Sequence, residues 1–424
     1  MERRTRKILL FVFLIIFLFT APTLTFYLQG YRFDFERKSL TQTGGLFLKV
    51  IPKQAEIYLD GKLAKKTDFF FGSALIENLL PKKYHIKVKK EGYFSWEKDL
   101  EIKEKEVTEA KNLVLFPKNP NFNILTKEAK NSWFSSDGKK IILEERNGEF
   151  WALKLYDLDR NVKSHLLKED DISKKGVELF NLKFSGNGKE IFLEVGTEEQ
   201  LKYFTLEIDR TPPLLKETKE PLSPLKDIVA YQTLNNETYY LDNLGYLSKT
   251  DSSFSIKEKI TELPFPLKQE TGYELNIYPE FIFLQEGQIL YLFNSDSKLF
   301  EKFFEGIRSS KISPDLKKLV YFSESEIWVL FLKEKMGRPK RKVGESIFLV
   351  RLSEKIKDVF WLNSNYLIFN AGDIIKIVEI DDRDKVNIID LAEFKNPEIF
   401  FNKEDKKLYI LTNGSLLFSE NLIP

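Results

Sequence analysis

The sequence predicts an all-β fold: a small β-sandwich followed by a seven-bladed β-propeller, with one N-terminal transmembrane helix before them. Three observations support this prediction. A strand-turn-strand cassette recurs from Trp133 to the C-terminal region, apolar residues occur in short runs separated by Gly, Asn, Asp or Pro, and the N-terminus is basic and then uncharged. Repeats of this period are typical of propellers, and short punctuated apolar runs are typical of strands.

Residues 8–28 are expected to form the transmembrane helix, after a cytoplasmic tail of residues 1–7. The uncharged stretch is about 21 residues long, which at a rise of about 1.5 Å per residue crosses a hydrocarbon core of about 30 Å. Basic residues precede it and mixed charges follow it, so we expect the N-terminus in the cytoplasm and the bulk of the chain outside it. The prediction is a single-pass membrane protein whose helix has the membrane as its partner.

The competing interpretation of this segment is a cleaved signal peptide with an apolar region from Ile8 to Phe19. However, Ala21-Pro22-Thr23 leads directly into Leu24-Thr25-Phe26-Tyr27, so no small-x-small cleavage site follows. We therefore prefer a retained anchor. Under both interpretations the residues after about position 30 are exported.

Residues 29–43 are assigned as a juxtamembrane linker and residues 44–117 as the β-sandwich. Asp60-Gly61 predicts a hairpin turn, because Gly tolerates the positive φ of a tight turn. Alternation in the segment 84–89 places Tyr84, Ile86 and Val88 on one face and His85 with two lysines on the other. The expected strands are Leu46–Ile51, Ala55–Leu59, Ser73–Leu79, Tyr84–Lys89, Trp96–Ile102 and Val107–Phe116.

The sandwich sequence resembles the PEGA domain family. The resemblance rests on two segments in the expected order and spacing, Gly45–Lys62 and Asn78–Tyr93. Of the Pro-Glu-Gly-Ala motif, this chain keeps Pro52 and Ala55 but has Lys53 and Gln54 between them. The resemblance implies an all-β module of cell-envelope proteins with no catalytic residues to carry over. A generic immunoglobulin-like or transthyretin-like spacer would lead to nearly the same functional conclusion.

Residues 118–424 are assigned as the propeller. Seven cassettes at a mean spacing of about 44 residues match four-stranded blades. The last blade lacks an outer strand, which Asn121–Thr126 could supply, so we predict that this segment pairs with the C-terminal blade. Six or eight blades remain alternatives, because the third and fourth cassettes lack the turn residues of the others. The second strands are expected at Lys140–Glu144, Glu190–Glu194, Ile228–Tyr231, Phe281–Leu284, Lys318–Phe322, Tyr366–Phe369 and Lys407–Leu411.

The turns of the cassettes carry small polar residues. Ser135-Ser136-Asp137-Gly138-Lys139 and Ser313-Pro314-Asp315 resemble the Ser-Pro-Asp-Gly-Lys turn of TolB-like and WD-like propellers. Ser and Asp side chains satisfy local backbone N–H groups, and Gly takes the left-handed position. Asp157-Leu158-Asp159 is spaced like the start of a calcium loop, but the expected Gly and the twelfth-position Glu are missing. We interpret it, and Asp381-Asp382-Arg383-Asp384 in a later cassette, as hairpin turns.

Composition excludes several classes of function. Lys and Arg number 66 against 64 Asp and Glu, a net charge of +2, so no long-range attraction to nucleic acid is expected. The chain has no cysteine and two histidines, which excludes disulfides and thiolate sites and leaves little for a zinc site. No Gly-x-Ser-x-Gly elbow or phosphate-binding glycine loop occurs. We therefore assign no catalytic residue, metal ligand or cofactor.

One basic run is a candidate binding loop. The segment 333–342 lies between two strands of the fifth cassette and includes Lys335, Arg338, Lys340, Arg341 and Lys342. The default interpretation is a solvated hairpin insertion. Contact with a polyanion, such as an anionic glycan, a wall polymer or phospholipid head groups, is the functional alternative.

These features predict a membrane-anchored, extracytoplasmic binding or scaffold protein of the cell envelope that is not an enzyme. Its propeller would be the interaction platform, and its partner an envelope protein or polysaccharide. The alternative is a carboxylate-dependent glycan hydrolase with its site in the propeller funnel, which needs two carboxyl groups about 5 to 9 Å apart. The tryptophans Trp133, Trp151, Trp328 and Trp361 lie in predicted blade strands, where we expect core rather than a glycan platform. A signalling receptor is disfavoured, because residues 1–7 hold no effector domain.

Overall fold

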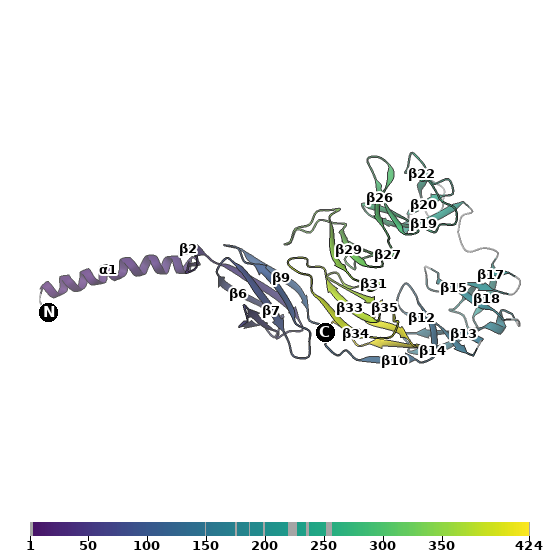
Figure 1. Cartoon of the computed structure of the whole chain (residues 1–424), viewed down its shortest axis with the longest axis horizontal. Coiled ribbons are helices and arrows are strands. Elements are labelled where there is room, and N and C mark those ends of the chain that lie inside the picture. The colour runs from purple at the N-terminus through teal and green to yellow at the C-terminus, as the bar shows by residue number, and fades with distance from the viewer. Residues whose placement is uncertain are drawn as a thin grey trace.

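The computed structural model describes residues 3–148, 150–173, 176–185, 187–197, 200–218, 227–234, 237–251 and 257–423. Within these residues one α-helix and 37 β-strands follow each other along the chain. Figure 1 shows three parts arranged end to end: the helix, a small sandwich, and a larger group of four-stranded sheets. The all-β class predicted from the sequence is confirmed.

The helix α1 (Arg3–Leu28) has the length and composition of a membrane span or of a signal sequence. Its apolar window, Thr5–Leu28, contacts no other part of the described chain closely enough to bury it. The hydroxyls of Thr20, Thr23 and Thr25 each donate to the backbone carbonyl four residues earlier. These bonds satisfy the threonine hydroxyls within the helix, as an apolar medium requires.

The segment 29–43, expected only to link helix and sandwich, contains a β-hairpin. Strands β1 (Tyr31–Asp34) and β2 (Ser39–Gln42) pair in antiparallel register, with Phe33 opposite Leu40. The short strands expose their apolar residues, so no buried period-2 pattern marks them in the sequence. The helix therefore passes into the sandwich through ordered structure.

The sandwich has two sheets, of order β6-β3-β9 and β5-β4-β7-β8. All six predicted strands occur. The predicted turn at Asp60-Gly61 connects β4 to β5, and β5 is a seventh strand that the sequence did not reveal. Strands β3 and β9 are paired in parallel. Tyr84, Ile86 and Val88 are buried, as their alternation predicts. The strands are β3 (Gly44–Ile51), β4 (Glu56–Leu59), β5 (Lys62–Lys66), β6 (Ser73–Leu79), β7 (Lys83–Lys89), β8 (Trp96–Glu101) and β9 (Val107–Val114).

After the sandwich come seven four-stranded antiparallel sheets in which consecutive strands are neighbours, apart from the sheet that contains both β10 and the C-terminal strands. The first six are β11–β14 (Ala129–Phe134, Lys140–Asn147, Phe150–Asp157, Val162–Lys168), β15–β18 (Glu178–Phe184, Glu190–Gly196, Leu201–Glu207, Leu214–Thr218), β19–β22 (Ile228–Leu234, Glu237–Asp242, Leu247–Asp251, Lys257–Lys259), β23–β26 (Tyr273–Tyr278, Phe281–Glu286, Ile289–Asn294, Leu299–Glu305), β27–β30 (Ser309–Ile312, Lys318–Phe322, Glu326–Phe331, Ser346–Arg351) and β31–β34 (Ile356–Asn363, Tyr366–Ala371, Ile374–Glu379, Ile388–Glu393).

The seventh sheet joins the two ends of this region. Its order is β10-β37-β36-β35, formed by β10 (Phe122–Thr126), β35 (Glu398–Asn402), β36 (Lys407–Thr412) and β37 (Ser415–Ser419). Phe122 lies opposite Ser419, and Ile124 opposite Leu417. The predicted pairing of the segment 121–126 with the C-terminal sheet is thus confirmed.

Buried apolar clusters connect neighbouring sheets in a propeller-like arrangement. One cluster joins β27–β30 to β31–β34, another joins β31–β34 to β35–β37, and others join β11–β14 to its two neighbours. Sheets β19–β22, β23–β26 and β27–β30 are likewise connected in series. No such cluster of described residues joins β15–β18 to β19–β22, and Figure 1 shows these two sheets apart from each other.

The cassette turns have the structural role that the sequence predicts. Ser135 Oγ accepts the N–H of Lys140 at 2.9 Å and donates to Asp137, whose carboxylate accepts the N–H of Lys139. The same pattern recurs at Ser185 and at Ser313. The residue after the acidic or amide position has positive φ: Gly in the first two turns and Leu316 in the third. The side chains of these polar residues are therefore engaged in hydrogen bonds to the backbone of their own turns.

Candidate functional site

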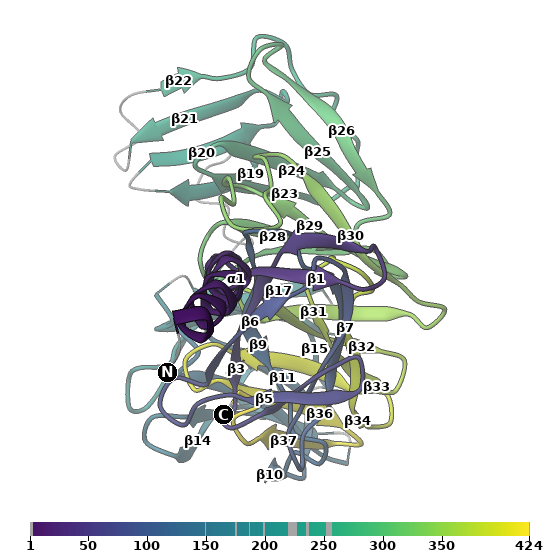
Figure 2. The ribbon, with the colours of Figure 1, turned by 90° about the vertical axis from the view of Figure 1, so that its left-hand side faces the viewer.

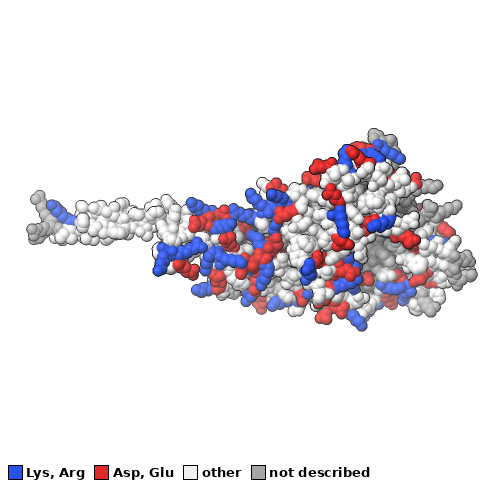
Figure 3. Space-filling model, turned by 45° about the horizontal axis from the view of Figure 1, so that its top comes forward, with Lys and Arg blue, Asp and Glu red and all other residues white. Residues whose placement is uncertain are grey.

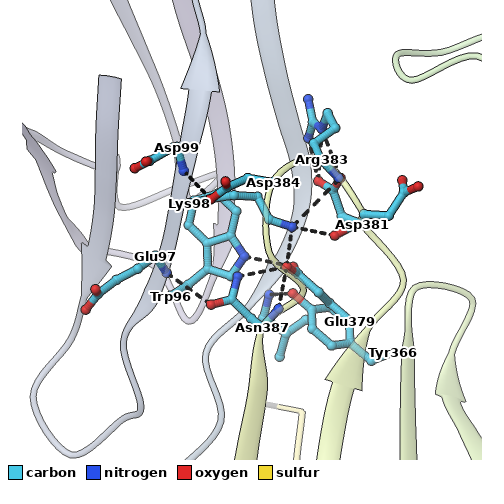
Figure 4. A network of polar contacts seen from close by, with 12 residues as sticks. Trp96, Glu97, Lys98, Asp99, Tyr366, Glu379, Asp381, Arg383, Asp384 and Asn387 are labelled. Atoms are coloured by element: carbon cyan, nitrogen blue, oxygen red, sulfur yellow. Dashed lines mark hydrogen bonds and ion pairs between the residues drawn. The ribbon is translucent and has the colours of Figure 1, made fainter. Parts of the chain in front are cut away.

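The junction between sandwich and sheets contains a buried lysine. Lys98 lies on β8 of the sandwich, and none of its surface is exposed. Its Nζ lies 2.5 Å from Oε1 of Glu379, at the end of β33, and it also donates to the backbone carbonyl of Asp381. Figure 4 shows these residues facing each other across the junction. An ion pair thus connects the two parts of the molecule.

The Glu379 carboxylate is fully engaged by donors. Trp96 Nε1 donates to Oε2 at 2.8 Å, and Asn387 donates to Oε1 through both its backbone N–H and its side chain. A buried ion pair recovers its desolvation cost only when additional hydrogen bonds satisfy the charged groups. In this junction Lys98 and Glu379 meet that condition.

The connection between β33 and β34 supplies the remaining polar contacts. Arg383 donates to both oxygens of Asp381 and to the Glu109 carbonyl on β9. Asp384 accepts the N–H of Asp99 at 3.1 Å. Burial alone would raise the pKa of Asp381, but its hydrogen bonds with Arg383 and the nearby Lys98 charge hold that pKa below its ordinary value. The acidic turn 381–384 is therefore a docking element as well as a turn.

Apolar packing continues the junction. Val114 at the end of β9 and Phe116 just after it belong to the same buried cluster as Ile368 and Leu408 of the sheets. The Tyr366 and Phe116 rings meet edge-on with centroids 5.2 Å apart, and the Tyr366 hydroxyl accepts the N–H of Val114. Burial raises the pKa of Tyr366. The end of the sandwich therefore packs into the core of the last two sheets.

The sequence did not reveal this junction, although β8 carried a signal. Trp96, Lys98 and Leu100 alternate, and the structure buries all three. A lysine in the inward-facing register of a strand has to find an acidic partner or remain unsatisfied. That partner lies 281 residues away in the chain, so local pattern could not name it.

The candidate basic loop lies between β29 and β30, beside the junction. Arg338 forms an ion pair with Glu106 of the sandwich, with Nη2 2.8 Å from Oε1. Arg341 pairs with Glu345 and with Asp382. The backbones of Lys335 and Arg341 bond to each other, which narrows the loop.

Two of the lysines in the loop point to solvent. Lys340 and Lys342 are exposed, and their ammonium groups have no ion-pair partner in the part of the chain that the structure describes. The loop is thus divided between arginines that contact the protein itself and lysines that are available to another molecule.

A second candidate site lies where the innermost strands converge. A pocket of about 320 Å³ is lined by β11, β15, β31, β35, β36 and β37. Phe134 and Phe400 stack in it with centroids 3.9 Å apart, and Phe360 meets Phe400 edge-on. Trp133, expected in the core, is half-buried and lines this pocket; Trp151 and Trp361 are in the core as expected.

Charged residues lie among these aromatic rings. Asp358 and Glu398 both line the pocket, together with Lys183. Lys311 Nζ lies 2.5 Å from Asp358 Oδ1 and 3.4 Å from the centroid of the Phe360 ring. Burial lowers the pKa of Lys311 despite its pairing with Asp358. No group of three or more His, Asp or Glu suited to a metal ion occurs among the described residues.

Comparison with known proteins gives no family. No family model matches the sequence, and no curated protein matches it. A chain of the mitotic checkpoint complex is similar with a TM-score of 0.45 and 9% identity, over 72% of this chain and 92% of that one. Virginiamycin B lyase from Staphylococcus aureus is similar with a TM-score of 0.41 and 11% identity, over 70% of this chain and 97% of that one. YCF48 from Cyanidioschyzon merolae is similar with a TM-score of 0.43 and 11% identity, over 70% of this chain and 98% of that one.

Proposed function

We propose that this protein is a membrane-anchored, extracytoplasmic binding or scaffold protein of the cell envelope, and that it is not an enzyme. In this proposal α1 is retained as the anchor, and the sandwich, which is PEGA-like in sequence, spaces a seven-bladed propeller from the membrane. The propeller presents its surface to an envelope protein or polysaccharide. The observation that carries the proposal is the buried Lys98–Glu379 junction.

The junction supports a scaffold because it fixes the propeller relative to the anchor. The helix continues into the β1–β2 hairpin and then β3 without a free linker, and the end of the sandwich packs into the core of the last two sheets. Strand β3 has eight residues, which at about 3.3 Å each space the propeller by roughly 26 Å. Figure 3 shows charges of both signs over the sandwich, whereas the helix is uncharged beyond the basic residues at its N-terminal end, as expected for a body in water and a helix in lipid.

The topology can be tested with a single cysteine, because the chain has none of its own. We replace Lys62, the exposed first residue of β5, and treat intact cells with a membrane-impermeant maleimide. Labelling of K62C before permeabilisation, together with retention in carbonate-washed membranes, would support the proposal. Labelling only after permeabilisation, or release of the chain from membranes, would contradict it.

The partner can be sought by proximity labelling. A biotin ligase is fused after the last residue of the full chain and expressed in its native cell. Enrichment of specific envelope proteins or wall polymer, relative to the same ligase on an unrelated anchor, would support scaffolding. Enrichment of nothing beyond that control would count against it.

For the basic loop we propose contact with an anionic polymer through Lys340 and Lys342, with Lys335, Arg338 and Arg341 shaping the loop. The K340E/K342E variant should lose retention on an anionic glycan or wall-polymer column. Reversal of two exposed sandwich lysines, K53E/K62E, is the control with the same change in net charge. Equal retention of the two variants would remove the polymer contact, because only total charge would then matter.

The alternative, a carboxylate-dependent glycan hydrolase, is favoured by one observation: Asp358 and Glu398 line the same pocket. Hydrolysis would release reducing ends from wall glycan, and both D358N and E398Q would abolish the release. E404Q, outside this pocket, is the control. Absence of any release by the unmodified protein would leave the binding role alone.

A further inference from the structure

The β1–β2 hairpin has an apolar face turned toward the outside. Phe33 and Leu40 lie opposite each other in the antiparallel register, and 49% and 50% of their surfaces are exposed. Phe35, at the tip, is 83% exposed and meets Phe33 edge-on with centroids 5.1 Å apart. Three large apolar side chains therefore form one exposed patch, which we call the hairpin patch.

The opposite face of the hairpin is polar and turned toward the protein. Asp34 and Thr41 are buried, and Asp34 Oδ1 accepts the N–H groups of Glu36 and Arg37. Arg32 donates to Asn78 at the end of β6 at 2.9 Å. A hairpin bathed in water places its apolar face inward and its polar face outward. This hairpin has the reverse arrangement, which is the arrangement that suits an apolar surrounding.

The hairpin patch also directly follows the apolar helix. Phe26 of α1 contacts Tyr31 of β1 edge-on at 5.4 Å, and the Arg32 guanidinium lies 3.7 Å from the centroid of the Tyr27 ring. The N–H and hydroxyl of Thr43 both donate to the Gly30 carbonyl, closing the hairpin onto the helix end. Figure 1 and Figure 2 both show the hairpin beside the end of α1. The exposed apolar surface thus continues from the helix onto the hairpin.

We propose that the hairpin patch lies in the outer interfacial layer of the membrane, with Phe33, Phe35 and Leu40 among the upper acyl chains. This inference rests on the proposed function, because it requires α1 to remain in the bilayer. Trp and Tyr are favoured where a membrane protein leaves the hydrocarbon core, and Phe and Leu form the apolar face of segments that lie in the interface. Arg37 and Lys38 flank the tip and are exposed, so their side chains can extend to lipid phosphates. The hairpin is then a second, shallow membrane contact beside the helix.

A matched position tests this assignment. Phe70, between β5 and β6, is 74% exposed and also has aromatic neighbours. It lies near the far end of β3, where Val50 and Gly72 bond to each other, about 20 Å from Gly44 at the rise of an extended strand. An equally exposed phenylalanine is therefore expected in water.

The experiment uses the full chain in nanodiscs, with one cysteine introduced at position 18, 35 or 70 and labelled with an environment-sensitive fluorophore. Lipids brominated near the head group should quench the label in F35C by about half or more, while F70C should be unaffected. Aqueous iodide should show the opposite order. The L18C label reports on the helix itself and should be quenched by lipids brominated deep in the acyl chain.

The outcomes distinguish the proposed membrane contact of the hairpin from the proposed membrane anchor α1. Quenching at 18 without quenching at 35 would overturn the membrane contact of the hairpin and leave the anchor intact. Equal quenching at 35 and 70 would also overturn it, because any exposed phenylalanine would then suffice. No quenching at 18 would refute the anchor and, with it, the inference. Circular dichroism of each labelled chain checks that the fold is retained.

Discussion

At the scale of single residues, Lys98 is the residue on which the two folded parts depend most. An ammonium group with no exposed surface is tolerated because the Glu379 carboxylate and the Asp381 carbonyl accept its hydrogen bonds. Glu379 in turn accepts hydrogen bonds from Trp96 and Asn387. The loss of stability on mutation is asymmetric. Removing one charge leaves the other buried and unpaired, whereas removing both charges does not.

This asymmetry gives a mutational prediction. E379A should destabilise the protein by about 3 to 5 kcal/mol, whereas the double variant K98M/E379L should recover most of that loss. Chemical denaturation followed by tryptophan fluorescence measures both. K66A, which removes an exposed pair with Glu56, should leave the unfolding midpoint nearly unchanged. If E379A were as stable as K98M/E379L, the Lys98–Glu379 pair would not be desolvated.

Asp381 gives a prediction about pH. Burial opposes its charged form, but Arg383 and Lys98 outweigh burial, so its pKa is lower in the folded state. A lowered carboxyl pKa stabilises the fold above the unfolded pKa of about 3.9, and this contribution is lost as pH falls through the folded value. D381N should be less stable than the unmodified protein at neutral pH, and should lose less stability between about pH 5 and about pH 3. Parallel loss in both proteins would contradict this assignment.

At the scale of elements, β10 has the clearest structural role, since it brings the start of the sheet region to its end. It pairs with β37 in antiparallel register, and Asn123, opposite Phe418, is exposed. At Asn123 the pairing is therefore carried by the backbone. A substitution that removes an N–H should matter here more than one that removes a side chain.

N123P should accordingly lower the melting temperature by roughly 5 °C or more, because Asn123 is at a hydrogen-bonded position of the ladder and proline removes its donor and constrains φ. N123A keeps the N–H and should behave nearly like the unmodified protein. Differential scanning calorimetry measures the two. If N123A were as destabilised as N123P, side-chain packing and not strand pairing would hold β10.

The elements also show what the sequence can predict. Strands with buried alternation and the turns around Ser135 and Ser313 were predictable, because their signals are local. Strands β1 and β2 were not, since their apolar residues face outward. The pocket around Phe134 and Phe400 and the Lys98–Glu379 pair bring together residues distant in the chain, and no local pattern specifies such contacts.

At the scale of the whole molecule, the apolar clusters are unevenly distributed. Sheets β31–β34 share buried cores with neighbours on both sides. Among the described residues, β15–β18 and β19–β22 share none with each other. Local stability follows the density of buried apolar contacts, so this part of the molecule is expected to open first.

Hydrogen exchange tests that expectation. Amides in β19–β21 should exchange faster than those in β31–β33, by about tenfold or more. Mass spectrometry of peptides from the full chain in detergent resolves the two groups. Equal protection would show that β15–β18 and β19–β22 are held together as firmly as the other sheets.

The parallel pairing of β3 and β9 has a mechanical consequence. The chain enters β3 at the helix end of the sandwich and leaves β9 at the other end, so tension between membrane and propeller pulls these two adjacent strands in opposite directions along their length. Their hydrogen bonds are then loaded together in shear and cannot be peeled apart one by one. Single-molecule pulling from the two ends should therefore extend the sandwich at higher force than the sheets that follow it.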